Sequence, residues 1–274
     1  MERAGRRISA AVHNSAAATG GMDTAPDAGA FARCYARGEP QVVWTRLVAD
    51  LETPVSAYLK LTGGKSGSGG NPSILLESVE GGATRGRYSV IALEPDLLWR
   101  ARGDVAEINT TPLKKPGAFK RDATAALDSL RALLASSRLE LPPGLPPMAA
   151  GVFGYLGYDT IRLVEHLPKV PPDDLGVPDS VLLRPTLVVI FDSVKDEMTV
   201  VTPVRPDPKV PADKAYKAAL KRLGQAVAAL DAPLPHGAPV STLKLAVPEP
   251  VSNTPPADYL DMVRRAKEFI KAGD

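Results

Sequence analysis

The strongest fold signal in this sequence is the apolar run VLLRPTLVVIF at residues 181–191. β-Branched and other large apolar residues fill most of the run, which favours a buried strand. A second run of this kind, Met-Thr-Val-Val at 198–201, follows a few residues after Asp192-Ser193. Two such runs joined by a short polar segment predict a β-hairpin.

Further strand-like segments precede this hairpin. They lie at 74–78, 87–93, 97–100 and 104–108, with Gly81-Gly82, Glu94-Pro95 and Gly103 between them. This spacing suits antiparallel hairpins better than βαβ units. Residues 41–49 could form a short strand or a helical turn, and residues 53–61 a short helix or strand. The Gly-spaced segment 150–156 favours a strand whose backbone a neighbour approaches closely.

Apolar residues at three- and four-residue spacing predict the helices. We expect one helix over 122–137 with Asp122 as its N-cap, one or two helical turns over 161–166, and a second helix over about 212–230. A last helix starts near Pro256, with Gly273 as its C-cap. The fold class is therefore predicted to be α+β, with antiparallel strands dominating.

Composition excludes several classes of protein. The chain has 274 residues, 44% hydrophobic and 23% charged, so it can bury a core without a metal or a disulfide. Its net charge of +2 gives no reason to expect nucleic acid or an anionic membrane as a partner. One cysteine, Cys34, and three histidines make a disulfide framework and a His/Cys zinc site improbable. No apolar run approaches the roughly 18 residues that span a bilayer, so we expect a cytoplasmic protein.

Residues 1–40 are predicted to be a disordered N-terminal extension. Residues 1–30 are rich in Ala, Gly and Ser and have no apolar periodicity. Arg3, Arg6 and Arg7 are not followed by the apolar run of a secretory signal, whereas composition leaves an organelle transit peptide open. Met22 could be the true start of the protein.

Four polar segments resemble functional sites, and a structural explanation is preferred for each. Gly64-Lys65-Ser66 lacks the earlier glycine of a phosphate-binding loop, and the glycine spacing at 151–157 does not match a dinucleotide-binding motif. The acidic residues at 173–174 and 192–197 suit solvated turns. Cys34 has no histidine nearby in the sequence. From the residues alone we predict no catalytic group, cofactor or metal site.

One segment does suggest a ligand. The run LLESVEGG at 75–82, followed by Arg87-Tyr88-Ser89, places a carboxylate, a hydroxyl and a guanidinium across a predicted hairpin. Glu77 could meet an ammonium group while Ser78 and Arg87 donate to a carboxylate, so the trio suits a zwitterionic small molecule. The alternatives are surface capping and a simple ion pair.

Several ordered blocks resemble the N-terminal region of anthranilate synthase component I. They are PVSAYLKL at 54–61, LLESVEGG at 75–82, GRYS at 86–89, GVFGYLGYD at 151–159, Pro178-Asp179 leading into the strand at 181–192, and the closing segment 259–274. The resemblance covers residues 41–274 and departs from the family pattern at Ala83-Thr84-Arg85.

The resemblance implies a layered β-sandwich with peripheral helices and a reaction in which chorismate is aminated with loss of pyruvate. It implies Mg²⁺ in the catalytic part and ammonia from a glutamine amidotransferase subunit. Residues 41–250 would be the N-terminal regulatory domain, and 251–274 the first helix of a chorismate-binding domain that this sequence lacks. Residues Leu76, Glu77, Ser78 and Arg87 would bind L-tryptophan as a feedback inhibitor. The fragment itself is then not expected to be catalytic.

Two other hypotheses remain open. The chain could be the corresponding part of aminodeoxychorismate synthase component I, which shares much of the pattern. It could also be a free-standing, non-catalytic α+β protein that binds a partner. A stable, monodisperse chain without an exposed apolar face would favour the last hypothesis.

Overall fold

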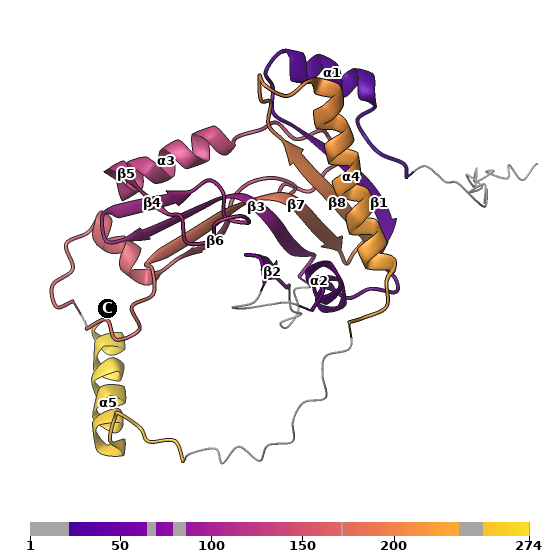
Figure 1. Cartoon of the computed structure of the whole chain (residues 1–274). Helices are drawn as coiled ribbons and strands as arrows, with labels where there is room; N and C mark the ends of the chain where they lie inside the picture. Colours follow the sequence, from indigo (N-terminus) through magenta and orange to yellow (C-terminus); the bar gives the residue numbers. More distant parts are fainter. Residues whose placement is uncertain (1–21, 65–69, 79–85, 171, 236–248, 274) are drawn as a thin grey trace, which may run out of the picture. The chain divides into compact units, whose positions relative to one another are not determined.

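The computed structural model describes residues 22–64, 70–78, 86–170, 172–235 and 249–273 (Figure 1). The chain divides into two compact units, Met1–His236 and Gly237–Asp274, and each is described by itself. Lys65-Ser66 and Gly81-Gly82, both considered in the sequence analysis, lie outside the described residues.

An antiparallel sheet of eight strands forms the first unit's framework, and the α+β prediction is confirmed. The strand order is β1 (Gln41–Val48), β8 (Glu197–Val204), β7 (Ser180–Asp192), β3 (Tyr88–Arg102), β4 (Val105–Asn109) and β5 (Lys120–Ala125). In addition, β2 (Ile74–Leu76) pairs with β3, and β6 (Phe153–Leu156) pairs with β7. The predicted hairpin over 181–201 is the β7–β8 pair.

A single strand, β3, replaces the two strands predicted at 87–93 and 97–100. Its pairing with β7 runs from Tyr88 opposite Asp192 to Ala101 opposite Ser180, with a register shift between Pro95 and Leu97. Proline cannot donate to the ladder, so Glu94-Pro95 predicts a turn. A bulge absorbs the irregularity because the long neighbouring strand continues to supply partners on both sides of it.

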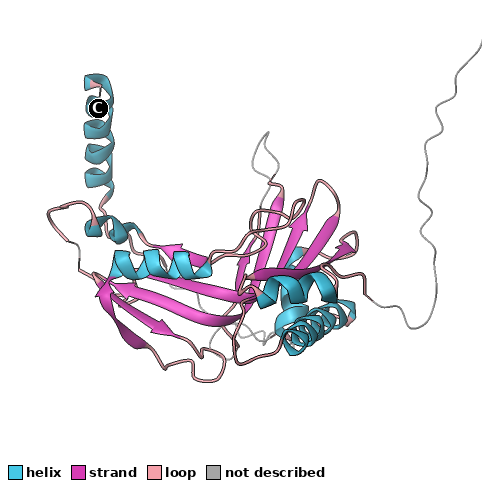
Figure 2. Ribbon diagram, turned by 90° about the horizontal axis from the view of Figure 1, so that it is seen from above, coloured by secondary structure: helices cyan, strands magenta, loops and turns pink. Residues whose placement is uncertain are grey.

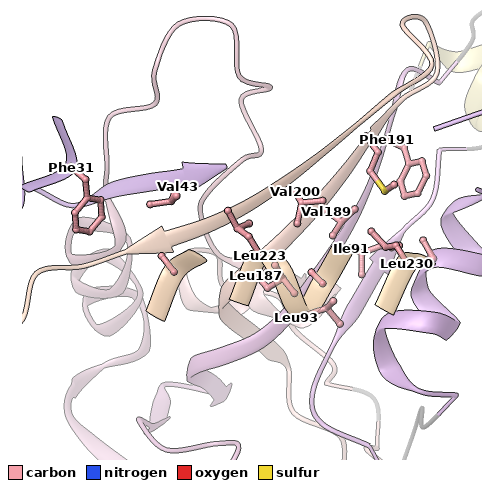
Figure 3. Packing of buried hydrophobic residues seen from close by; sticks show 14 of the residues in the cluster. Phe31, Val43, Ile91, Leu93, Leu187, Val189, Phe191, Val200, Leu223 and Leu230 are labelled. Carbon is pink, nitrogen blue, oxygen red and sulfur yellow. The ribbon is translucent and has the colours of Figure 1, made fainter. Parts of the chain in front are cut away.

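Apolar residues on one face of the sheet pack against three helices. These are α1 (Ala28–Ala36), α2 (Pro54–Thr62) and α4 (Ala212–Asp231), of which α4 confirms the helix predicted at 212–230. Figure 3 shows Ile91, Val189 and Val200 of the sheet together with Leu223 and Leu230 of α4 in this core. Alternate residues on β3 and β7 belong to the cluster on the opposite face, as strand geometry requires.

Helix α1 corrects the prediction that residues 1–40 are disordered, as far as residues 22–40 are concerned. Asp27 accepts a hydrogen bond from the Ala30 amide and caps the helix, while Phe31 and Tyr35 are buried in the core. An Ala- and Gly-rich segment with little periodicity is therefore ordered by two aromatic anchors and a cap.

Helix α3 (Ala126–Ser137) begins later than predicted, because Asp122 lies in β5 and is not its N-cap. The indole nitrogen of Trp99 donates to the Ser129 hydroxyl at 2.9 Å, and that hydroxyl donates to the Asp122 carboxylate at 2.6 Å. The bond from Ser129 helps to lower the pKa of Asp122. The N-cap residue is Ala125, which has no capping side chain, and the Asp104 carboxylate from another segment accepts from the Ala126 amide at 3.0 Å.

Two of the three glycines at 151–157 allow a close approach of neighbouring backbone, as predicted. A Cβ on Gly154 would lie 1.9 Å from the Val181 carbonyl oxygen, and one on Gly157 would lie 2.7 Å from the Asp179 carbonyl oxygen. Strand β6 therefore needs glycine at these positions to lie against β7. The helical turns predicted at 161–166 form a 3₁₀ helix, η2, at Tyr158–Leu163.

Helix α5 (Pro256–Ala272) is the described element of the second unit, and it ends at Gly273 in a left-handed conformation, as predicted. Figure 2 shows the helices and strands from above. Within the described ranges, no helix combines the length and the apolar character needed to cross a membrane.

Candidate functional site

A cavity of about 310 Å³ lies where α2 begins, β2 ends, β3 begins and β7 turns into β8. We call it the Arg87 cavity. Its lining residues are Ala49, Glu52, Thr53, Pro54, Glu77, Ser78, Gly86, Arg87, Ser89, Phe191, Asp192, Ser193 and Asp196. Three of the four residues predicted to bind an effector, Glu77, Ser78 and Arg87, are among them.

Ser78 is held at the cavity wall by its neighbours on the β3 side. Its amide donates to the Ser89 hydroxyl at 3.0 Å. A Cβ on Gly86 would lie only 1.7 Å from the Ser78 oxygen, so glycine is required where the two segments meet. Ser78 and Ser89 both line the cavity, and a serine hydroxyl can act as a donor or an acceptor towards a bound molecule.

Arg87 forms a bidentate ion pair with Asp192 across the β3–β7 pair. Its Nε donates to one carboxylate oxygen at 3.0 Å and an Nη donates to the other at 2.8 Å. The hydrogen bonds from Arg87 lower the pKa of Asp192, whose side chain is only 8% exposed. Bidentate pairs of this kind are geometrically specific and strong.

The ion pair changes the role that the sequence suggested for Arg87. Two of its donor groups are already bound to a buried carboxylate. If they turned to a ligand, Asp192 would be left as an uncompensated charge, which is costly. Arg87 therefore fixes the cavity wall, and its remaining donors are those free to face a ligand.

The start of α2 forms another wall. Thr53 and Ser56 make a capping box, in which each side chain accepts from the other residue's amide at 2.9 to 3.1 Å. Glu52 accepts from Ser56 Oγ at 2.6 Å and is paired with Lys60. Burial raises the pKa of Glu52, but the bonds from Lys60 and Ser56 outweigh it, and the net shift is downward. This wall is therefore ordered and largely charge-balanced.

Glu77 and Leu76 have different positions relative to the cavity. Glu77 follows the end of β2 and is an exposed wall residue, and no ion pair or hydrogen bond to another described residue engages its carboxylate. Leu76 is also exposed, but it is the last residue of β2 and is not among the lining residues. The structure thus brings together Glu77, Ser78 and Arg87 and leaves Leu76 outside.

The cavity has an acidic lining with an apolar base. Glu52, Glu77, Asp192 and Asp196 carry negative charge, whereas Arg87 is the cation in the lining. Phe191, which is nearly fully buried, supplies an aromatic surface. Because the charges of Glu52 and Asp192 are matched by Lys60 and Arg87, the remaining field favours a ligand ammonium near Glu77.

Sequence reasoning missed Phe191 and Asp192 as wall residues, although they end the strongest strand in the sequence. Asp192 lies 105 residues beyond Arg87 in the sequence. Only the register of β3 on β7 brings Phe191 and Asp192 close to Arg87. The acidic residues at 192–197 predict a solvated turn. Asp192 is instead the buried partner of Arg87.

A metal centre is not evident in the part of the chain that the structure describes. Within it, no group of three or more His, Cys, Asp or Glu side chains is placed to hold a metal ion. The resemblance implies Mg²⁺ in the catalytic part of such enzymes, and that ion stays a prediction.

Known proteins similar to this chain are anthranilate synthase subunits. It is 45% identical over 244 residues to anthranilate synthase component 1 of Cereibacter sphaeroides, covering 89% of this chain and 48% of that protein. It is 37% identical over 229 residues to the Thermus thermophilus protein of the same name, covering 83% and 44%. The chain thus spans about half the length of the curated relatives it matches.

A solved structure is also similar. The crystal structure of anthranilate synthase component I from Streptococcus pneumoniae TIGR4 matches with a TM-score of 0.46 and 23% sequence identity, covering 83% of this chain and 45% of that chain.

The family model of chorismate binding enzymes matches residues 73–274. We expected the chorismate-binding part to begin only at residue 251, and a match that begins at residue 73 does not support that expectation. The match covers most of the chain, including α5 and the lining residues of the Arg87 cavity from Glu77 onwards. This chain belongs to the chorismate-binding enzyme family.

Proposed function

We propose that this chain forms the effector-binding part of an anthranilate synthase component I and that the Arg87 cavity binds L-tryptophan. The observation that carries the proposal is the convergence of Glu77, Ser78 and the Arg87–Asp192 pair on one cavity of about 310 Å³. Ligand sites of small molecules start at about this volume. The names of the relatives support the choice of enzyme.

In the proposed complex, Glu77 accepts hydrogen bonds from the ligand ammonium. The hydroxyls of Ser78 and Ser89 lie near the carboxylate of the ligand. The indole packs towards the aromatic ring of Phe191. A charge-assisted bond to Glu77 contributes most to affinity, because no ion pair with a described residue neutralises that carboxylate.

The proposed binding can regulate because the walls come from separate elements. Residues Thr53, Ser78, Arg87 and Asp192 belong to four different segments of the chain. A ligand that contacts all four favours the arrangement in which they are close together, and its differential affinity sets the size of the effect. The reaction so regulated would be the conversion of chorismate to anthranilate, with a glutamine amidotransferase subunit as the ammonia source.

Isothermal titration of L-tryptophan into the full chain tests this proposal, with Glu77→Gln as the variant. Loss of the charged acceptor is expected to weaken binding about tenfold. Glu249→Gln, at an exposed position in the second unit, is the matched control and should bind as the unchanged chain does. Indole-3-propionate, which lacks the ammonium group, should not compete.

Two results would contradict the proposal. One is the absence of saturable heat with a chain whose circular dichroism shows it to be folded. The other is equal affinity of the Glu77→Gln variant and the unchanged chain, which would place the ligand elsewhere.

A further inference from the structure

A second cavity, of about 650 Å³, lies at the opposite end of the β3–β7 strand pair. We call it the Tyr158 cavity. Its walls are β6, η2 and the segment that leads into β7, and its base includes Ala101 at the end of β3 and Ser180 at the start of β7. None of its lining residues belongs to the Arg87 cavity.

Large apolar side chains are exposed in and around this cavity. Tyr158 and Leu175 are each 84% exposed and Val170 is 72% exposed. Val164, Val177 and Leu156 add to the same stretch of chain. Single exposed apolar residues are ordinary, but a contiguous group beside a cavity is typical of a surface that another molecule covers.

Carboxylates surround the apolar part. Asp104, Asp159, Asp173 and Asp179 line the cavity, whereas Arg162 is the cation in the lining. A charge excess of this sign, next to apolar side chains, complements a partner that presents Lys or Arg beside an apolar residue.

Local hydrogen bonds fix these carboxylates. Asp179 accepts from the Gly103 amide at 2.6 Å and Asp173 from the Gly176 amide at 2.9 Å. Asp159 accepts from Arg162 Nε at 2.6 Å and Asp104 from the Ala126 amide. A backbone amide orients a carboxylate but supplies no opposite charge, and among the described residues only Asp159 of these four acids has a cationic partner, Arg162.

The cavity floor is also ordered. Tyr155 donates through its hydroxyl to the Pro178 carbonyl at 2.8 Å, and the Gly157 amide donates to the Asp179 carbonyl at 2.7 Å. The hydroxyls of Thr160 and Ser180 share a hydrogen bond of 3.0 Å. A surface held in this way binds a partner without a large cost in ordering its own side chains.

We propose that the Tyr158 cavity is the docking surface for a basic segment of a separate protein subunit. An apolar side chain of that segment enters the cavity near Leu175, and flanking Lys or Arg side chains meet Asp173 and Asp179. The inference rests on the proposed function, since the relatives' name, component 1, implies a further subunit. The acidic surroundings exclude a phosphate-rich partner such as nucleic acid.

Amide NMR spectroscopy of the full chain tests this docking surface. The probe is a peptide with a central Leu-Trp-Leu flanked on each side by two Lys residues, and its matched control carries Glu in place of Lys. The basic peptide is expected to shift amides of η2, β6 and residues 172–180, while the acidic peptide leaves them unchanged. The combined variant Asp173→Asn and Asp179→Asn should weaken binding of the basic peptide about fivefold, because each charge pair near solvent contributes modestly.

A control variant, Asp128→Asn with Asp213→Asn, removes two exposed carboxylates from α3 and α4 and should leave peptide binding unchanged. Equal binding of both peptides, shifts elsewhere in the molecule, or no shifts at all would overturn the inference. Concentration-dependent shifts of the same amides without peptide would overturn it too, because a second copy of this chain would then cover the surface. L-Tryptophan binding at the Arg87 cavity is measured separately, so failure here is distinguishable from failure of the proposed function.

Discussion

The Arg87 cavity and the Tyr158 cavity lie at the two ends of the same strand pair and differ in how their charges are balanced. At the Arg87 cavity, Asp192 is buried against a guanidinium. At the Tyr158 cavity, Asp173 and Asp179 are held by backbone amides, and no described residue forms an ion pair with either of them. The first arrangement favours a small ligand that supplies one ammonium group, and the second favours a larger basic surface.

The β3–β7 strand pair explains how one sheet can carry both the Arg87 cavity and the Tyr158 cavity. From the Asp192 end to the Ser180 end, β7 is paired with β3 through a bulge. At about 3.3 Å per residue the two cavities are separated by roughly 40 Å of strand. Long paired strands can therefore carry separate cavities at their two ends, and if the proposed sites are independent, a substitution at one end leaves the other unchanged.

The largest effect is expected from Gly154→Ala, which acts on the Tyr158 end. The new Cβ would lie 1.9 Å from the Val181 carbonyl oxygen and 2.9 Å from the Leu182 Cα, and both atoms are backbone. Strand β6 must move away from β7, and we expect the free energy of unfolding to fall by about 3 kcal/mol. Urea denaturation followed by circular dichroism measures it.

Gly224→Ala is the matched control, because a Cβ there meets no atom within 4 Å and the residue lies inside α4. It should stabilise the chain by about 0.5 to 1 kcal/mol. Equal destabilisation by both substitutions would contradict the close packing of β6 on β7.

An intermediate effect is expected from Asp192→Ala at the Arg87 end. The change removes two hydrogen bonds from Arg87 and one from the Val194 amide. Arg87 is partly exposed and can be hydrated again, so we expect a loss of about 1 to 2 kcal/mol in unfolding free energy. Asp213→Ala, which breaks an exposed pair with Lys217, should cost much less.

The effect of Asp192→Ala on the free energy of unfolding is expected to depend on pH. The folded-state pKa of Asp192 lies below its ordinary value because of the hydrogen bonds from Arg87. Its contribution to stability is therefore fully present above the unfolded pKa of about 4 and is lost as the pH falls through the folded pKa. The difference in stability between the unchanged chain and Asp192→Ala should shrink below about pH 4, and a constant difference would contradict the pairing.

The smallest effect is expected from Leu175→Asp on tryptophan binding. Leu175 is highly exposed at the Tyr158 cavity and contributes nothing to the Arg87 cavity. Titration of L-tryptophan into this variant should give the affinity of the unchanged chain within about twofold, by the additivity of distant sites. A larger change would mean that the two ends of the strand pair are coupled.

Sequence reasoning predicted the elements that depend on local pattern. The β7–β8 hairpin, α4 and the glycine cap of α5 follow from apolar spacing and from residue types that act within a few positions. Two predictions were wrong, namely Asp122 as an N-cap and a turn at Glu94-Pro95. In both cases a neighbouring strand imposed pairing that local signals do not encode.

Only part of the candidate site could be predicted from the sequence. Glu77, Ser78 and Arg87 stand close together in the sequence, so a hairpin hypothesis could join them. Asp192 and Phe191 enter through the register of β7 on β3, which no local pattern reveals. Because of this register, Arg87 donates to the carboxylate of Asp192. The sequence had suggested that Arg87 would donate to a carboxylate of the ligand.

Hydrogen–deuterium exchange of the full chain with and without L-tryptophan tests the central claim most directly. We predict slower exchange at residues 76–78, 86–89 and 191–194, which surround the Arg87 cavity, and unchanged exchange at residues 155–163 beside the Tyr158 cavity. Protection confined to the Tyr158 cavity, or no protection at a tryptophan concentration that saturates the heat signal, would contradict the assignment of the effector site.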